Sequence, residues 1–561
     1  MRVNVSIRFL FYAWLLIAGG LAGAGDRLKP AAAAIASAHP LATAAGMDIL
    51  AHGGNAFDAA VTVSAVLAVV EPYSSGLGGG GFWLLHRASD ALDVMIDGRE
   101  RAPLRAHRAL YLDQQGNVIK RLSMDGVSAA AIPGEPAALV HLSEKYGRLP
   151  LSQVFAPAIR YARNGFRVDK HYIDMTRFRL RALRLSVASR AIFLNKGQLP
   201  ALGDKIVQKD LADTFEHLVN QGHQGFYGGM IARQLVAAVK AAGGIWTEED
   251  LTAYQVVERT PLVGQYRGLK ITSVAPPSSG GVALITMLNM LSAYDLESMT
   301  TVQRSHVLIE VMRRAYRDRA LYLGDMDQIT IPLQHLLSTS HADDLRHSIQ
   351  SDDASVSASF ADASSLQEGR DTTHFSILDK EGNRVAATMS INYPFGSGFT
   401  VPGTGILLND EMDDFSSKPG VPNVYGLVGA EANAIAAGKR PLSSMSPTFV
   451  EGKDGVAILG TPGGSRIISM VLLGILDFAA GHNADSWVSL PRFHHQYLPD
   501  YVQYEAAAFD DDTLVDLEMM GHQMQPLQGR YGNMQAVFWD KKAGKVSAAS
   551  DPRGNGSARV E

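Results

Sequence analysis

The clearest pattern of apolar and polar positions lies between residues 372 and 390. Two runs of β-branched, aromatic and apolar residues, 372–378 and 384–390, flank the turn-forming stretch Asp-Lys-Glu-Gly-Asn at 379–383. This pattern predicts a β-hairpin centred on Glu381. The expected register places Ser390 opposite Thr372, with Asn392 just beyond it.

Other apolar runs predict alternating helices and strands. Residues 455–460 form a short apolar run typical of a buried strand, and residues 465–480 have the length and apolar content of a helix. Residues 40–52 and 56–70 predict two helices, with Asn55 as the cap of the second. A further helix is expected over 301–323 with its charges on one face. Residues 340–371 are polar, and we expect them not to pack tightly.

Thr372 is the strongest candidate for a catalytic residue. A threonine hydroxyl is a poor nucleophile without a base beside it, but cleavage of the Asp371–Thr372 bond frees an α-amine on the same residue. We therefore expect a nucleophile that forms by cleavage of the chain.

A strand, a Thr-Pro-Gly-Gly turn and a helix follow one another at residues 455–480. Gly463 and Gly464 have no side chains to block a ligand, and a helix N-terminus presents free N–H groups. This arrangement suits an oxyanion hole. An ordinary strand-to-helix turn explains the same letters equally well.

Three further stretches carry groups suited to an amino-acid-like ligand. Residues 409–415 contain several carboxylates, suited to an ammonium group or equally to a metal ion. Residues 443–446 offer hydroxyl groups for a carboxylate. Arg99 and Arg101 supply guanidinium groups, the preferred partners of a planar carboxylate. Each stretch alone is typical of a solvated surface, so their combination carries the hypothesis.

The motifs along the chain resemble those of γ-glutamyltranspeptidase (glutathione hydrolase) proenzymes, members of the N-terminal-nucleophile hydrolase superfamily. The resemblance covers essentially everything after the first 24 residues, in unchanged order. Its motifs are His39-Pro40-Leu41-Ala42, residues 53–60 (GGNAFDAA), 78–82 (GGGGF), 276–281 (PPSSGG), 318–319, 322–325, 441–447 (PLSSMSP), 462–466 (PGGSR), 491–495 (PRFHH) and 550–553 (SDPR).

The resemblance implies a role for each candidate residue. Thr372 is the nucleophile of self-cleavage, at the Asp371–Thr372 site, and of turnover, with Ser390 orienting it. The oxyanion hole is implied to be Gly463 and Gly464. The residues implied to bind the substrate α-carboxylate are Arg99, Ser443 and Ser444, and those implied to bind its α-amino group are Asn392, Glu411 and Asp414.

The resemblance also implies a fold and an activity. The fold is an α/β four-layer αββα sandwich built by two intertwined subunits of one precursor, a large subunit of 25–371 and a small subunit of 372–561. The two subunits form a heterodimer. The expected reaction transfers the γ-glutamyl group of glutathione and related compounds to water or to an amino acid or peptide, through a γ-glutamyl-threonine ester. Neither a cofactor nor a metal is implied.

A lid is implied at residues 416–430. This stretch is rich in Pro and Gly, and composition alone favours a plain surface loop. Related enzymes carry a lid loop at this position, although some members lack it. We expect Tyr425 in this stretch to reach Asn392 and restrict access to the site.

The N-terminus and the net charge limit where the protein is expected to act and what it is expected to bind. Two arginines, an apolar run over 9–18 and Ala22-Gly23-Ala24 are typical of a signal peptide covering residues 1–24. This predicts a periplasmic or secreted enzyme with no stable membrane span after signal removal, and an uncleaved anchor is the alternative. The absence of cysteine means that no disulfides are available. The net charge of −5 gives no reason to expect nucleic-acid binding, and the arginines of 160–190 are expected on solvated helix faces.

Some motifs fail in context. Residues 76–81 match G-x-G-x-x-G, but an expected helix precedes them where a nucleotide site requires a strand. His494 and His495 are adjacent, so structural roles are favoured over a shared metal. His374 is expected on the same strand face as Thr372, but the terminal amine is favoured as the base.

Two alternatives remain open. A cephalosporin or glutaryl acylase of the same superfamily needs no α-ammonium recognition, so Glu411 and Asp414 argue against it. An exported amino-acid-binding protein without chemistry needs no nucleophile, so Thr372 and the groups around it argue against that.

Overall fold

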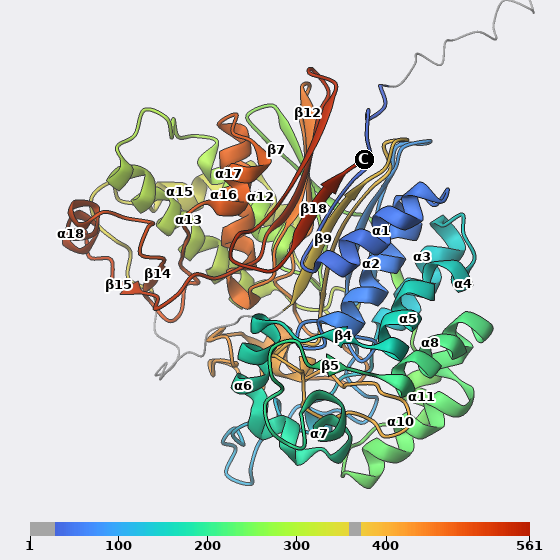
Figure 1. The fold of residues 1–561 in the computed structure, drawn as a ribbon. Coiled ribbons are helices and arrows are strands. Elements are labelled where there is room, and N and C mark those ends of the chain that lie inside the picture. Colours follow the sequence, from blue (N-terminus) through green and yellow to red (C-terminus); the bar gives the residue numbers. More distant parts are fainter. Residues whose placement is uncertain (1–27, 358–371) are drawn as a thin grey trace, which may run out of the picture.

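The computed structural model describes residues 28–357 and 372–561. Two antiparallel sheets face each other, and helices cover the outer face of each sheet (Figure 1). Ala34, Leu84, Leu378, Ile458 and Trp539 belong to the apolar cluster between the sheets. Two larger apolar clusters fill the remaining layers, one between each sheet and the helices that cover it. The expected αββα sandwich is confirmed.

The first sheet has seven strands. Their order is β18 (Ser557–Val560), β1 (Ala34–Ser37), β9 (Thr373–Leu378), β10 (Arg384–Ser390), β2 (Gly80–Arg87), β3 (Leu92–Gly98) and β6 (Val257–Arg259). The hairpin formed by β9 and β10 lies in the middle of this sheet, between β1 and β2. The part of the chain after residue 372 therefore completes a sheet begun by the part before 357.

The second sheet has six strands and mixes the two parts of the chain in the same way. Their order is β17 (Lys545–Ser550), β16 (Gln535–Asp540), β12 (Gly455–Gly460), β11 (Thr448–Glu451), β8 (Leu269–Ser273) and β7 (Leu262–Tyr266). Because both sheets contain strands from both parts, neither part has a complete core of its own.

Helices cover the outer face of the first sheet. They are α1 (Pro40–Ala51), α2 (Ala56–Val70), α3 (Glu135–Tyr146), α5 (Ala156–Asn164) and α8 (Lys209–Gln221). Every residue of α2 is buried, and Asn55 caps it in a capping box with Asp58. Such a cap stabilises a helix by about 1 kcal/mol. The predicted helices and cap over 40–70 are confirmed.

Helices also cover the second sheet. Those in contact with its strands are α12 (Gly280–Leu291), α16 (Ile467–Ala479) and α17 (Ala484–Ser489), and α13 (Thr301–Tyr322) packs on α12. The remaining elements are α4 (Leu151–Val154), α6 (Lys170–Leu185), α7 (Val187–Phe193), α9 (Gln224–Tyr227), α10 (Gly229–Ala241), α11 (Glu248–Thr252), α14 (Leu333–Leu336), α15 (Thr339–His347), α18 (Asp511–Met519), β4 (Phe166–Arg167), β5 (Lys205–Ile206), β13 (Phe493–His494), β14 (Val502–Tyr504) and β15 (Met524–Pro526).

One expectation from the sequence needs correction. The charged residues Glu310, Arg313 and Arg314 of α13 are buried and do not lie on an exposed face. They bind polar groups of residues 345–357: Arg314 donates to Ser348 O (2.8 Å) and Ser355 Oγ (3.0 Å). The reason is that the polar segment supplies the hydrogen bonds that buried arginines require. Most residues of 345–357 are exposed, as expected, and the rest of the polar stretch, 358–371, lies outside the described residues.

The arginine-rich stretch follows its prediction with one exception. Arg163, Arg167, Arg177 and Arg184 are exposed on or beside α5 and α6. Arg179 is buried instead, and its guanidinium donates to the backbone oxygens of residues 394 and 396.

Candidate active site

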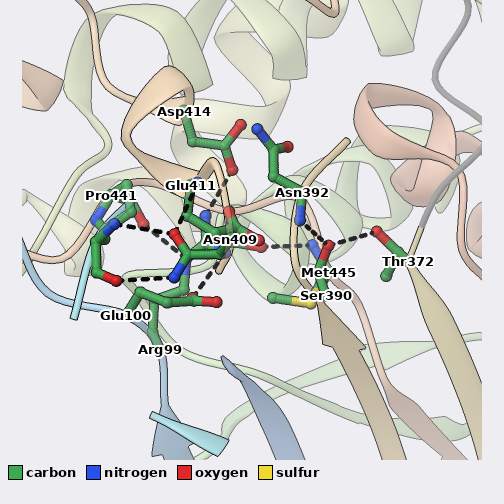
Figure 2. Close-up of polar contacts among 12 residues, drawn as sticks. Arg99, Glu100, Thr372, Ser390, Asn392, Asn409, Glu411, Asp414, Pro441 and Met445 are labelled. Atoms are coloured by element: carbon green, nitrogen blue, oxygen red, sulfur yellow. Dashed lines mark hydrogen bonds and ion pairs between the residues drawn. The ribbon is translucent and has the colours of Figure 1, made fainter. Parts of the chain in front are cut away.

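Thr372 lies immediately before β9, opposite the end of β10. In the hairpin, Thr373 pairs with Met389 and Leu378 with Arg384, so the predicted register is confirmed. The Thr372 and Ser390 hydroxyl oxygens are 3.1 Å apart, and Ser390 Oγ accepts a hydrogen bond from Asn392 N at 2.8 Å (Figure 2). Thr372 has a φ of 92°, which is unusual for a β-branched residue. The hydroxyl is therefore fixed by a neighbouring hydroxyl in a sheet core.

Gly463 and Gly464 lie between β12 and the short 3-10 helix Gly464–Arg466 that leads into α16. Both have positive φ, 139° and 56°. A Cβ on Gly464 would lie 2.9 Å from the Tyr425 ring, and one on Gly463 would lie 2.6 Å from Met470 Cε. Both the backbone conformation and the space therefore require glycine here.

Arg99 follows β3 and has a buried cluster of carboxylates around it (Figure 2). Its Nη1 lies 2.6 Å from Glu411 Oε2 and 3.3 Å from Glu100 Oε2, and its Nη2 lies 2.5 Å from Asp414 Oδ2. Its Nε donates to Pro441 O at 3.1 Å. Glu411 and Asp414 come from one 3-10 turn, Glu411–Asp414. Three carboxylates thus share one guanidinium.

Burial dominates the titration of this cluster. It raises the pKa of Glu411 well above its usual value, although the charge of Arg99 opposes the shift. Burial likewise raises the pKa of Glu100 to about 8. Burial opposes the charge of Arg99, but Glu411, Glu100 and Asp414 outweigh it and raise the pKa of Arg99. Burial disfavours the ionised form of these carboxyl groups, and a further cation bound beside them would stabilise that form.

The predicted hydroxyl and amide groups complete the wall. Ser444 Oγ accepts a hydrogen bond from Arg319 Nη2 at 3.3 Å, and Ser443 Oγ accepts one from Met445 N at 3.1 Å. Asn392 Nδ2 donates to Asp410 O at 3.0 Å.

Tyr425, the residue of the predicted lid, lines the same cavity as Thr372. Its hydroxyl donates to Asn392 O at 2.9 Å, and its own carbonyl accepts from Gln496 Nε2 at 3.1 Å. Tyr425 and Leu427 are buried, so this part of 416–430 is no plain surface loop.

One cavity brings these groups together. The candidate residues that line it are Arg99, Thr372, Ser390, Asn392, Glu411, Asp414, Tyr425, Ser443, Ser444 and Gly464. Gly463 lines a second cavity, which also contains Thr372. The first cavity has a volume of only about 20 Å³, which is room for about one water. Asp371, the residue before the expected cut, lies outside the described residues.

Arg319 also lines this cavity, and the sequence did not single it out as a site residue. It lies on α13, where burial lowers its pKa, and its Nε donates to Ser279 Oγ at 3.1 Å. The sequence could have indicated Arg319 in one way: it lies among the apolar residues of a long predicted helix, and a buried arginine there needs a partner.

The histidines behave as structural residues. Burial lowers the pKa of His494 to about 3 and that of His495 to about 4. His374 lies between the hydroxyls of Thr388 (2.8 Å) and Ser376 (3.2 Å). Residues 28–357 and 372–561 hold no group of three or more His, Cys, Asp or Glu side chains placed for a metal ion. In the same residues, no helix has the length and apolar character needed to cross a membrane.

Comparison with known proteins places these features in a family. The gamma-glutamyltranspeptidase family model matches residues 42–560. The glutathione hydrolase proenzyme of Pseudomonas sp. (strain A14) is 45% identical over 493 residues, covering 87% of this chain and 85% of that one.

Solved structures are similar as well. A cephalosporin acylase from Bacillus halodurans superposes with a TM-score of 0.83 at 27% identity, covering 95% of this chain and 96% of that chain. The Helicobacter pylori gamma-glutamyltranspeptidase superposes with a TM-score of 0.55 at 40% identity, covering 57% of this chain and 92% of that chain.

Proposed function

The chain belongs to the gamma-glutamyltranspeptidase family, and from that premise we propose that it is a self-cleaving glutathione hydrolase and γ-glutamyltransferase. The observation that carries the proposal is the cavity itself. Thr372 lines it together with Arg99, the carboxylates of Glu411 and Asp414, the hydroxyls of Ser443 and Ser444, and Gly464. These groups match the α-carboxylate, the α-ammonium and the developing oxyanion of a γ-glutamyl substrate.

The reaction is acyl transfer. Thr372 Oγ1 attacks the γ-carbonyl carbon, and the N–H groups of Gly463 and Gly464 stabilise the oxyanion. The C–N bond breaks, and the leaving amine takes up the proton. Water or an amine then attacks the ester, the bond to Thr372 Oγ1 breaks, and the hydroxyl recovers its proton. The α-amine of Thr372 acts as base after the chain is cut before it. These steps use only groups of the chain, so we expect no cofactor.

Substrate binding exchanges one set of ion pairs for another. Arg99 contacts Glu411 and Asp414 in this structure. When a γ-glutamyl group enters, its α-carboxylate pairs with Arg99, Ser443 and Ser444. Its α-ammonium takes the place of the guanidinium beside Glu411, Asp414 and Asn392. The bound ammonium then balances part of the carboxylate excess around Arg99, which lowers the cost of desolvation.

The proposed maturation yields a large subunit, 25–371, and a small subunit, 372–561, that stay together as a heterodimer. The relative is a proenzyme by name, and the similar gamma-glutamyltranspeptidase chain covers only 57% of this one. Interleaved strands in both sheets keep the two parts in one fold after cleavage. Residues 1–24 are proposed to be a signal peptide that directs the enzyme to the periplasm or outside the cell.

A cephalosporin or glutaryl acylase is the second candidate, because a cephalosporin acylase shares the fold over nearly the whole chain. A glutaryl group lacks the α-ammonium. Glu411 and Asp414 beside Arg99 would then have no partner on the ligand. Turnover of a γ-glutamyl anilide and of a glutaryl anilide separates the two: we expect the first alone, and preference for the second would overturn the proposal.

Maturation is tested with Thr372→Ala. The wild type should run as two fragments, and the smaller, of 190 residues (372–561), should begin Thr-Thr-His on N-terminal sequencing. The variant should stay uncut and inactive, because it lacks the attacking oxygen. A fully active wild type that remains one chain would contradict the mechanism.

A further inference from the structure

A second cavity meets Thr372 from another side. It has a volume of about 200 Å³ and is lined by Thr372 and Gly463, whereas Gly464 lines the first cavity. The glycine pair of the proposed oxyanion hole therefore lies between two spaces. A carbonyl carbon held at Thr372 can be approached from both.

An amide substrate needs room on both sides of its carbonyl. On the proposed function, the γ-glutamyl side binds at the groups around Arg99, in the cavity that Tyr425 also lines. The second cavity is about ten times larger by the same measure and opens at the same nucleophile.

Most charged groups of the second cavity already have partners. Arg553 binds Glu505 at 2.7 Å and Asp551 at 3.1 Å. Asp174 binds Lys170 and Arg177, each at 2.6 Å. These groups stabilise the walls and have little capacity left for a ligand.

Glu71 and Arg530 are the remaining Asp, Glu, Lys or Arg residues of the lining. Arg530 is exposed at the cavity and makes no hydrogen bond or ion pair with any residue of 28–357 or 372–561. Glu71 is buried, and its carboxylate accepts a hydrogen bond from Thr373 Oγ1 at 2.9 Å. Thr373 is the residue next to the nucleophile, so the acidic group lies near Thr372, whereas Arg530 belongs to the loop between β15 and β16.

We propose that Arg530 is a specificity residue, which selects leaving and acceptor amines that carry a free carboxylate as they bind in the second cavity. The amine end lies toward Glu71 and Thr372, and the carboxylate pairs with Arg530. In transfer, the amine nitrogen forms a bond to the γ-carbonyl carbon, the bond from that carbon to Thr372 Oγ1 breaks, and the proton lost by the amine ends on Oγ1. The ligand class is an α-amino acid or a short peptide.

This inference rests on the proposed function, so its test uses paired substrates. Glutathione and glutathione amidated at its glycine carboxylate differ only in the group that Arg530 is proposed to bind. Arg530→Ala should lower kcat/KM for glutathione about tenfold, the effect of losing about 1.4 kcal/mol, and leave the amide unchanged. Glycylglycine and glycylglycinamide as acceptors should show the same contrast.

Arg530→Lys and Arg233→Ala serve as controls. The lysine should recover part of the discrimination, because it keeps the charge without the bidentate geometry. Arg233 is an exposed arginine of α10 that lines neither cavity, so its replacement should change nothing. Equal effects of Arg530→Ala on both donors, or none on either, would overturn the proposal. A wild type that cleaves neither donor would instead contradict the proposed function.

Discussion

Glu310 and Glu411 are both fully buried glutamates beside arginines, yet their environments shift their pKa values in opposite directions. Glu310 contacts Arg313 Nε at 3.0 Å and Arg314 Nη1 at 2.5 Å. Burial opposes its ionisation, but the two arginines outweigh burial and lower its pKa. Glu411 shares its single arginine with two other carboxylates, and burial raises its pKa.

The difference separates a structural cluster from a ligand-binding one. Around α13, two arginines meet Glu310 and Asp500, so the charges balance within the protein. Around Arg99 the carboxylates are in excess, and neither oxygen of Glu411 receives a well-directed hydrogen bond. A balanced cluster needs no ligand, whereas an excess of one charge is stabilised by a ligand of the other.

The largest expected effect follows from removing Arg99. Arg99→Ala should lower kcat/KM by an amount equivalent to about 2–5 kcal/mol, because the substrate carboxylate loses its partner. Arg99→Lys should recover only part of the loss. Self-cleavage involves no free substrate carboxylate and should proceed nearly normally. Steady-state kinetics with a γ-glutamyl anilide measure this, and unchanged kinetics would remove Arg99 from the site.

A change in the cluster of Glu310, Arg313 and Arg314 should alter the stability of the protein and not its catalytic activity. Glu310→Gln should lower the free energy of unfolding by about 3 kcal/mol at pH 7, because two buried arginines lose their shared anion. The kcat/KM of the folded enzyme should stay unchanged. Since folding lowers the pKa of Glu310, its contribution is present above the unfolded value of about 4.5 and is lost as the pH falls through the lower folded value. Denaturant titrations should therefore give the largest difference between the two proteins at pH 7 and a smaller difference at pH 3.

Glu411→Gln should give the opposite dependence on pH. Folding raises the pKa of Glu411, so the wild type loses stability as the pH rises above the unfolded value of about 4.5. The neutral amide removes this loss, and the variant should be more stable by about 1 kcal/mol at pH 8. Thermal unfolding at pH 5 and pH 8 tests this. A variant that is less stable than the wild type at pH 8 would mean that Glu411 is balanced like Glu310.

The smallest effect is expected at the lid. Deleting residues 419–426 removes Tyr425 and its hydrogen bond to Asn392. Self-cleavage should remain intact, and activity on γ-glutamyl groups attached to bulky chains should rise, because less of the site is shielded. A donor series of increasing size, assayed on both forms, measures the change. An identical size profile would make this stretch an ordinary loop.

Local pattern alone determined much of this protein. The hairpin register, the capped α2, and the strand, turn and helix at 455–480 follow from alternation, apolar length and turn residues, which act between neighbours in the chain. The candidate residues around Thr372 also came from the sequence, as a nucleophile with suitable groups near it and a family resemblance. Their roles as binding groups stay predictions.

Only the tertiary structure decided which charges are exposed and which face one another. Arg319 reaches the cavity, and Arg313 and Arg314 bind residues 345–357, because α13 is enclosed on all sides by packing that a helical period does not encode. The contact of Arg99 with Glu411 and Asp414 joins residues more than three hundred positions apart. Burial and long-range pairing set the charge state of such groups, and both are properties of the folded chain.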